Sequence, residues 1–188
     1  ELGIGTAINF CLYKPVAENN IEKIKSYMWY YKWAYRIIAV IVTIIGLVLI
    51  PFLNVLVKDP GNVGNIIIYY LIYLFNTVTT YFVSYKYTLV NAEQKNYIYT
   101  NVNLIISTST IIIQVIALVI WKNFLIYLLV AAIFGIFQKI FICIYFNRLY
   151  PYLKEKNIEK LTKNEKSILI TKIKALVIHK IGDVSVHQ

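Results

Sequence analysis

Long uncharged runs alternate with short basic segments along this chain. Three runs contain no charged residue: 37–57, 60–85 and 96–121. A fourth run, 123–147, contains a single charge, Lys139. A helix needs about 20 mostly apolar residues to cross a hydrocarbon core of about 30 Å. The pattern therefore predicts an all-α, polytopic bundle with four complete transmembrane spans, at residues 37–57, 65–87, 97–120 and 124–146.

The segments outside these spans predict partial helices and cytoplasmic loops. Residues 1–13 are too few to cross a bilayer, so we interpret them as the end of a truncated transmembrane helix. Residues 14–36 predict a cytoplasmic loop and the beginning of the next helix, and residues 147–166 a second cytoplasmic loop. Residues 167–188 mix lysines with apolar residues at helical spacing, which indicates an amphipathic interfacial helix that leads into a truncated span.

Two pairs of residues have the spacing of a capping box, in which a side chain at the helix start and a carboxylate three residues later bond each other's backbone N–H. Asn19 precedes Glu22 by three residues, and Thr162 precedes Glu165 by three. The sequence therefore predicts that one helix begins near Asn20 and another just after Thr162.

Composition agrees with a membrane protein. Hydrophobic residues make up 59% of the chain and charged residues 15%, against about 45–50% and about 25% in a soluble domain. The net charge of +10 would also suit a nucleic-acid-binding protein, but no such motif accompanies it. The basic residues lie beside the apolar runs, where anionic headgroups attract them. We therefore expect membrane lipids, and no nucleic acid, as partners.

The Lys and Arg counts of the polar segments predict how the spans are oriented. Five lie in residues 14–36, one between the first two spans, two in 86–95, one between the last two spans and nine in 148–180. Rich and poor segments alternate, as antiparallel spans require, and rich segments stay inside. The count places residues 14–36, 86–95 and 148–180 in the cytoplasm.

Residues suited to catalysis are sparse. Cys11 and Cys143 stand singly in apolar runs, and His179 and His187 lie eight residues apart, where we interpret them as interfacial or solvated histidines. The sequence contains no glycine-rich phosphate loop and no Asp-x-Asp pair. We expect a protein that is not an enzyme and that uses no metal and no cofactor.

Neutral polar residues recur at helical spacing in two of the spans. One stripe contains Asn103, Ser107, Thr110 and Gln114, and the other contains Tyr69, Tyr73, Asn76, Thr80 and Ser84. Because polar groups that face lipid are costly, both stripes should turn inward. They would either bond helices to one another or line a hydrophilic cavity for a polar substrate, and the spacing leaves both open. The cavity candidates are Asn76, Thr80, Asn103, Ser107, Thr110 and Gln114.

Two charges lie far from the predicted interfaces and join the cavity candidates. Glu1 is thirteen residues before Lys14, about 20 Å along a helix, so its carboxylate should face water or a cation. Lys139 is nine residues before Arg148, about 13 Å from the cytoplasmic end of its span. Lys139 would either snorkel to the interface or offer a cation to a substrate phosphate.

Several short motifs, taken in order, resemble the polysaccharide-export flippases of the multidrug/oligosaccharidyl-lipid/polysaccharide exporter superfamily, which includes the O-antigen (Wzx-type) flippases. They cover essentially the whole chain. The motifs are Glu1–Ile8 (ELGIGTAI), Leu12–Glu18 (LYKPVAE), Ile21–Ile24 with Tyr35–Ile38, Leu89–Lys95 (LVNAEQK), Leu149–Pro151 (LYP) and Leu176–Gly182 (LVIHKIG).

The resemblance implies that the chain is a fragment that runs from the end of helix 2 to the start of helix 7 of a transporter with 12 to 14 helices. It implies two helical bundles around a cavity that opens alternately to each side. The implied substrate is an oligosaccharide on an undecaprenyl diphosphate carrier, flipped across the bacterial cytoplasmic membrane for export of O-antigen, capsule or a similar polysaccharide. Other polysaccharide-assembly proteins are further candidate partners.

Three alternatives stay open from the sequence. The first is a multidrug or other lipid exporter of the same fold. The second is a non-transporting membrane protein of polysaccharide assembly, such as a glycosyltransferase or polymerase, although the loops between the spans are short for one. The third is a small structural membrane protein.

Overall fold

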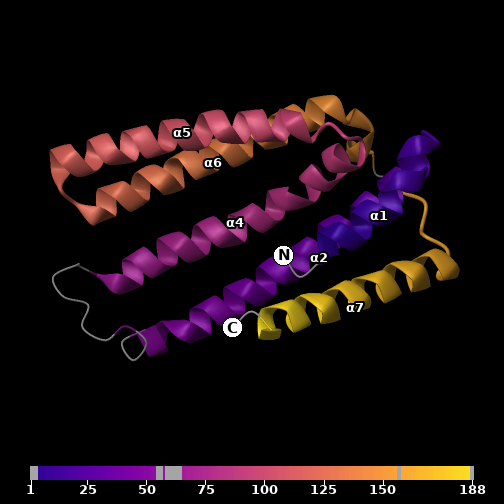
Figure 1. Ribbon diagram of the computed structural model, residues 1–188, viewed down its shortest axis with the longest axis horizontal. Coiled ribbons are helices and arrows are strands. Elements are labelled where there is room, and N and C mark those ends of the chain that lie inside the picture. The colour runs from indigo at the N-terminus through magenta and orange to yellow at the C-terminus, as the bar shows by residue number, and fades with distance from the viewer. Residues whose placement is uncertain (1–3, 54–56, 58–64, 156–157, 187–188) are drawn as a thin grey trace. The chain divides into compact units, whose positions relative to one another are not determined.

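The computed structural model describes residues 4–53, 57, 65–155 and 158–186. Every regular element in that part of the chain is a helix (Figure 1). The long helices are α1 (Ile4–Ala17), α2 (Ile21–Leu49), α4 (Ile66–Ala92), α5 (Asn96–Trp121), α6 (Phe124–Leu149) and α7 (Lys163–Val186). Two short 3₁₀ turns follow α2 and α6, and they are η1 (Ile50–Phe52) and η2 (Pro151–Lys154).

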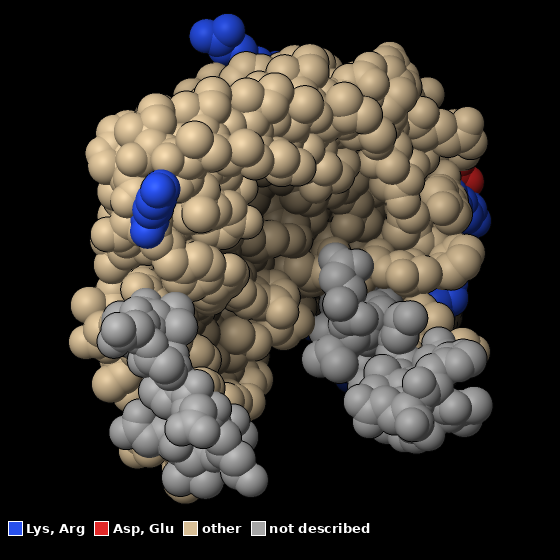
Figure 2. Space-filling view, turned by 60° about the vertical axis from the view of Figure 1, so that its left-hand side comes forward, with Lys and Arg blue, Asp and Glu red and all other residues tan. Residues whose placement is uncertain are grey.

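Four of these helices are long and apolar enough to cross a membrane: Ile21–Phe52, which joins α2 to η1, and α4, α5 and α6. The shortest has 26 residues, which at about 1.5 Å per residue exceeds a core of about 30 Å. Only 6% to 17% of the most apolar stretch of each is buried within the protein. So much exposed hydrocarbon requires lipid around it, and much of the surface in Figure 2 carries no charged side chain. The chain is an all-α, multi-pass membrane protein, which confirms the predicted fold class.

The helix boundaries differ in detail from the predicted spans. Helix α2 begins at Ile21, in agreement with the helix start expected near Asn20, so it includes sixteen residues before the predicted span at 37–57, and it gives way to η1 near Pro51. Helix α1 continues through Lys14 and Pro15 to Ala17, so most of the stretch 14–36 is helical and not loop. Residues 58–64, in the connection between the first two predicted spans, lie outside the described residues. The described helices pack as two compact units, residues 1–34, 84–99 and 146–188, and residues 35–83 and 100–145, which we call the first and the second unit.

The first unit has a core of both aromatic and aliphatic side chains. Helix α7 packs along α1, and Tyr31, Ile8, Leu12, Leu89 and Val90 are almost completely buried. Leu169 of α7 is buried, whereas Ile168 and Ile170 on either side of it are about half exposed. The helix predicted to lie in the interface therefore buries one side against protein and leaves other apolar side chains open.

The second unit contains the α5–α6 hairpin and close contacts between α2 and α4 (Figure 1). A side chain at Gly46 of α2 would collide with Leu74 of α4. The Tyr70 hydroxyl of α4 donates a hydrogen bond to the Gly46 carbonyl at 2.8 Å. Small residues at such positions let membrane helices approach closely, which increases their dispersion contact.

Three connections, α1 to α2, α4 to α5 and α5 to α6, are short because a single residue ends the first helix of each pair. Asn19, Gln94 and Lys122 have positive φ angles of 52°, 59° and 49°, the left-handed conformation that ends many helices. Asn123 then caps α6, since its side-chain oxygen accepts from the Leu125 N–H at 2.8 Å.

One predicted capping box is confirmed and the other is shifted. The Thr162 N–H donates to the Glu165 carboxylate at 2.8 Å, and the Glu165 N–H donates to the Thr162 hydroxyl at 3.3 Å. At the start of α2 the cap is Asn20 and not Asn19, because the Asn20 side chain accepts from the Lys23 N–H at 3.1 Å. Asn19 is occupied in the left-handed turn that ends α1, so it cannot also be the cap.

We predict that Gln94→Gly stabilises the protein by about 1 kcal/mol, because a left-handed conformation strains any residue with a Cβ by about 1–2 kcal/mol. The measurement is the midpoint of thermal unfolding in a neutral detergent. Gln94→Ala is the control, since it removes the same side chain but keeps the strain. A glycine variant no more stable than the alanine variant would contradict the prediction.

An ion pair holds the beginning of α7 to α2. Lys23 Nζ lies 2.8 Å from Glu165 Oε1, and each side chain is 27% exposed. The hydrogen bond from Lys23, followed by the bond from the Thr162 N–H, lowers the pKa of Glu165 to about 2 from an ordinary value of 4.5. A carboxylate whose pKa is depressed by folding stabilises the folded state above its ordinary pKa, and this contribution disappears as the pH falls toward the folded-state pKa.

We therefore expect wild type to be more stable than Glu165→Gln at pH 7, and the difference to shrink as the pH is lowered from about 4.5 to about 2. Thermal unfolding of both proteins across this range measures it. Glu159→Gln, at an exposed carboxylate, is the matched control. A difference between wild type and Glu165→Gln that stays constant with pH would refute the assignment.

Candidate functional site

Lys139 lies within the spanning helix α6 and contacts the facing side of α4. Its Nζ is 2.6 Å from Asn76 Oδ1, 2.8 Å from the Asn76 carbonyl oxygen and 2.7 Å from Thr79 Oγ1. A lysine ammonium has three N–H donors, so these three acceptors satisfy it. All three are neutral, and the positive charge is therefore solvated by dipoles and not cancelled by them.

The local sequence explains how α4 comes close enough to reach this lysine. Gly135 lies one turn before Lys139 on the same side of α6, because residues four apart share a helix face. A Cβ at Gly135 would be 3.0 Å from Asn76 Oδ1, tighter than an ordinary contact. The absent side chain thus leaves room for the Asn76 amide.

Thr80 supports this arrangement without touching the lysine. Its hydroxyl donates to the Asn76 carbonyl at 2.8 Å, one turn earlier on its own helix. The Thr79 hydroxyl also has carbonyls of its own turn within 2.9 Å, so it can donate there while its oxygen accepts from Lys139.

The polar stripe on α5 divides into two kinds of residue. Asn103 Oδ1 accepts from Gln138 Nε2 of α6 at 2.6 Å, and Gln114 Nε2 donates to the Tyr127 carbonyl of α6 at 3.2 Å. Ser107 and Thr110 instead donate to carbonyls of their own helix, at Leu104 and Ile106. Asn103 and Gln114 therefore join α5 to α6, whereas the two hydroxyl side chains do not cross between helices.

The expectation that both stripes face inward holds at some positions and fails at others. Gln114 is buried and Asn76, Asn103 and Thr110 are half-buried, but Ser107 and Thr80 are exposed. A hydroxyl that bonds the preceding turn of its own helix can face lipid at little cost, because it has no unsatisfied donor. Glu1, the remaining cavity candidate, lies outside the described residues.

Three residues of this site are absent from the predicted set: Thr79, Gly135 and Gln138. Each had a weak signal in the sequence. Thr79 is three residues after Asn76, Gly135 is four before Lys139, and Gln138 is the only other strongly polar residue in the predicted span 124–146. We call the group formed by Asn76, Thr79, Lys139, Gln138 and Asn103 the α4–α6 polar cluster.

The cluster offers a fixed cation and several amide and hydroxyl groups, a chemistry suited to binding an anion with attached hydroxyls. In the described part of the chain no group of three or more His, Cys, Asp or Glu side chains is placed to hold a metal ion. Comparison of the chain with protein-family models, with curated proteins and with solved structures gave no match in any of the three.

Proposed function

We propose that this chain is part of a flippase that moves lipid-linked oligosaccharides across a bacterial cytoplasmic membrane. Two features support the proposal: the four spanning helices, and the ordered motifs that resemble the polysaccharide-export flippases. The observation that carries it is the ammonium of Lys139, whose three acceptors in the described part of the chain are all neutral and lie within a spanning segment.

A cation in this position needs a physical reason. A lysine near the centre of a spanning helix costs about 2.5–3.5 kcal/mol on insertion scales. Its three acceptors satisfy its hydrogen bonds but leave a net positive charge in a medium that screens poorly. A phosphate group that passes beside it would neutralise that charge. In our proposal, this attraction offsets part of the desolvation free energy of the lipid diphosphate as it crosses the membrane.

The neutral members of the cluster would serve the saccharide. Asn76, Thr79, Asn103 and Gln138 can each exchange a protein partner for a sugar hydroxyl, because amides and hydroxyls both donate and accept. The lipid tail would stay in the bilayer while the headgroup travels through the protein. Residues 14–36, 86–95 and 148–180 would face the cytoplasm, where lipid-linked saccharides are assembled.

The competing interpretation is that Lys139 only joins α6 to α4. The two interpretations differ in what happens to stability when the charge is removed. A buried charge without a counter-charge carries an uncompensated desolvation cost, so an apolar side chain of similar length should leave the fold at least as stable. A residue needed for transport alone would lose activity under that change and keep the fold.

We predict that Lys139→Met, introduced into the gene that encodes this sequence, lowers polysaccharide export at least about tenfold, the loss expected when a hydrogen bond to a charged group of about 1.5–3 kcal/mol is removed. The thermal midpoint of the purified variant should equal or exceed that of the wild type. Lys139→Arg, which keeps the charge, should retain part of the export.

Gln114→Leu is the matched control, because it breaks a neutral bond between α5 and α6, from Gln114 to the Tyr127 carbonyl, that lies outside the cluster. It should lower stability and affect export less than Lys139→Met. Unchanged export in Lys139→Met cells would remove the transport role of this lysine. Equal losses of stability and export would show that it is a structural link.

The proposed orientation has its own test. In a background with Cys11 and Cys143 replaced by serine, we expect Asn123→Cys to react with a membrane-impermeant thiol reagent added to intact cells. Gln94→Cys, in the connection between α4 and α5, should react only after the cells are opened, because the lysine-rich segments stay inside. The opposite pattern would reverse the topology.

A further inference from the structure

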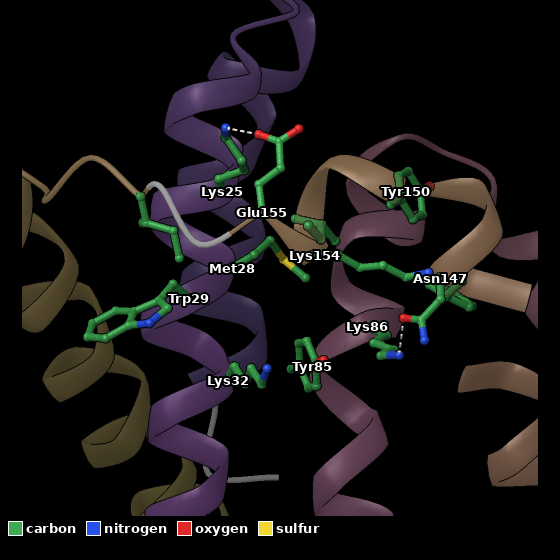
Figure 3. A pocket seen from close by; sticks show the side chains of 13 residues that line it. Lys25, Met28, Trp29, Lys32, Tyr85, Lys86, Asn147, Tyr150, Lys154 and Glu155 are labelled. Carbon is green, nitrogen blue, oxygen red and sulfur yellow. Dashed lines mark hydrogen bonds and ion pairs between the residues drawn. The ribbon is translucent and has the colours of Figure 1, made fainter. Parts of the chain in front are cut away.

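The first unit contains a cavity that the polar cluster does not include. It has a volume of about 580 Å³ and is lined by parts of α2, α4, the end of α6 and the segment that begins with η2. This volume is within the range of about 300–1,000 Å³ that is usual for small-molecule sites. Figure 3 shows Lys32 of α2 and Tyr85 of α4 directed into the space between their helices.

The lining is strongly cationic. Four lysines line the cavity, Lys25, Lys32, Lys86 and Lys154, against one carboxylate, Glu155. Lys25 lies 2.8 Å from Glu155 and 2.6 Å from Glu22, a carboxylate outside the lining. Even when both carboxylates are counted, four positive charges face two negative ones.

Two of these lysines are held in place by protein. Lys25 and Lys86 are only 5% and 8% exposed. Lys86 Nζ donates to Asn147 Oδ1 at 2.9 Å and lies 5.9 Å from the centre of the Tyr85 ring (Figure 3). Buried lysines whose ammonium groups are held by hydrogen bonds form a site of defined geometry, whereas exposed lysines at a membrane surface stay flexible.

The rest of the lining is aromatic and apolar. The lining includes the aromatic residues Trp29, Tyr85, Phe146 and Tyr150, and Met28 adds a flexible apolar side chain. Rings of this kind accept the flat faces of sugars or the first units of an isoprenoid chain, because both present C–H surface beside polar groups. Lys86 directly follows an uncharged run of 26 residues, 60–85, which places the cavity at headgroup depth.

We propose that this cavity binds a phosphate or diphosphate monoester that carries an apolar or sugar substituent. The excess lysine charge matches the two or more negative charges of such a group. The aromatic residues of the lining would contact its apolar or sugar substituent. The identification of the ligand as the phosphate end of the transported lipid rests on the proposed function. The cavity would then hold the headgroup at the membrane face from which it enters the protein.

The test measures binding to the purified chain in a neutral detergent, with geranylgeranyl diphosphate and inorganic pyrophosphate as probes and geranylgeraniol as the uncharged analogue. We expect the diphosphate lipid to bind and geranylgeraniol not to bind. Tight binding of pyrophosphate would identify a soluble phosphate compound as the natural source, and binding of the lipid alone would identify a membrane lipid. Both results support a phosphate site.

The variants are chosen to avoid the buried positions. Lys154 is exposed and Lys32 half-buried, so Lys32→Gln/Lys154→Gln should fold normally and weaken binding at least about tenfold, as expected when hydrogen bonds to a charged group are lost. Lys14→Gln, at a lysine whose side chain is 82% exposed outside the cavity, is the control and should bind as wild type.

Equal binding by the double variant and wild type would overturn the inference, as would an equal loss in Lys14→Gln or equal binding of phosphatidylglycerol vesicles. The transport assay separates this inference from the proposed function. Normal export together with a missing phosphate site would refute only the site. Lysine-dependent diphosphate binding together with normal export by Lys139→Met would refute only the transport role of Lys139.

Discussion

The hydrocarbon core of a bilayer contains no hydrogen-bond partners, and this constraint shapes every spanning segment of the chain. Backbone groups there must bond within their own helix, so the apolar runs can only be helical. Side chains obey the same rule. Ser107 and Thr110 bond their own helix, Asn103 bonds Gln138 across two helices, and Lys139 collects three acceptors from α4.

Hydrogen bonds to neutral acceptors do not cancel the charge of an ammonium group. Lys139 therefore differs from the neutral polar residues that join the same helices. An amide pair such as Asn103 and Gln138 is complete once its bond is made, because neither side chain carries a net charge. An ammonium among neutral acceptors still attracts an anion over several ångströms, most strongly where water is scarce. The same helix α6 therefore carries, at adjacent positions, a residue that joins helices and a residue suited to a charged substrate.

The first unit uses cations differently. Here lysines, carboxylates and aromatic rings occur together, as they do at the headgroup layer of membrane proteins. Ion pairs order part of this charge: Lys23 with Glu165 ties α7 to α2, and Lys25 with Glu155 ties α2 to the segment after η2. Three further lysines, Lys32, Lys86 and Lys154, line one cavity together with Lys25, and aromatic residues are part of the same lining. Charge in this unit thus both joins segments distant in sequence and forms a candidate anion site.

The sequence by itself determined the four spanning helices, because helix formation in lipid depends on the length of an uncharged run and on little else. It also determined the cap at Thr162 and Glu165, whose partners are three residues apart. It misplaced the cap of α2 by one residue, since Asn19 and Asn20 are equally suited to the role. Asn19 is excluded only because it adopts the left-handed conformation that ends α1.

Only the tertiary structure decided which polar residues meet. The rotation and the axial offset of α4, α5 and α6 relative to one another selected Asn76 and Thr79 for Lys139 and paired Gln138 with Asn103. The cationic cavity likewise draws on residues from 25 to 158, and no local pattern brings these together. Rotation and offset result from the fit of many side chains, such as Leu74 against Gly46 and Asn76 against Gly135, and a fit between distant segments is not encoded in the periodicity of either one.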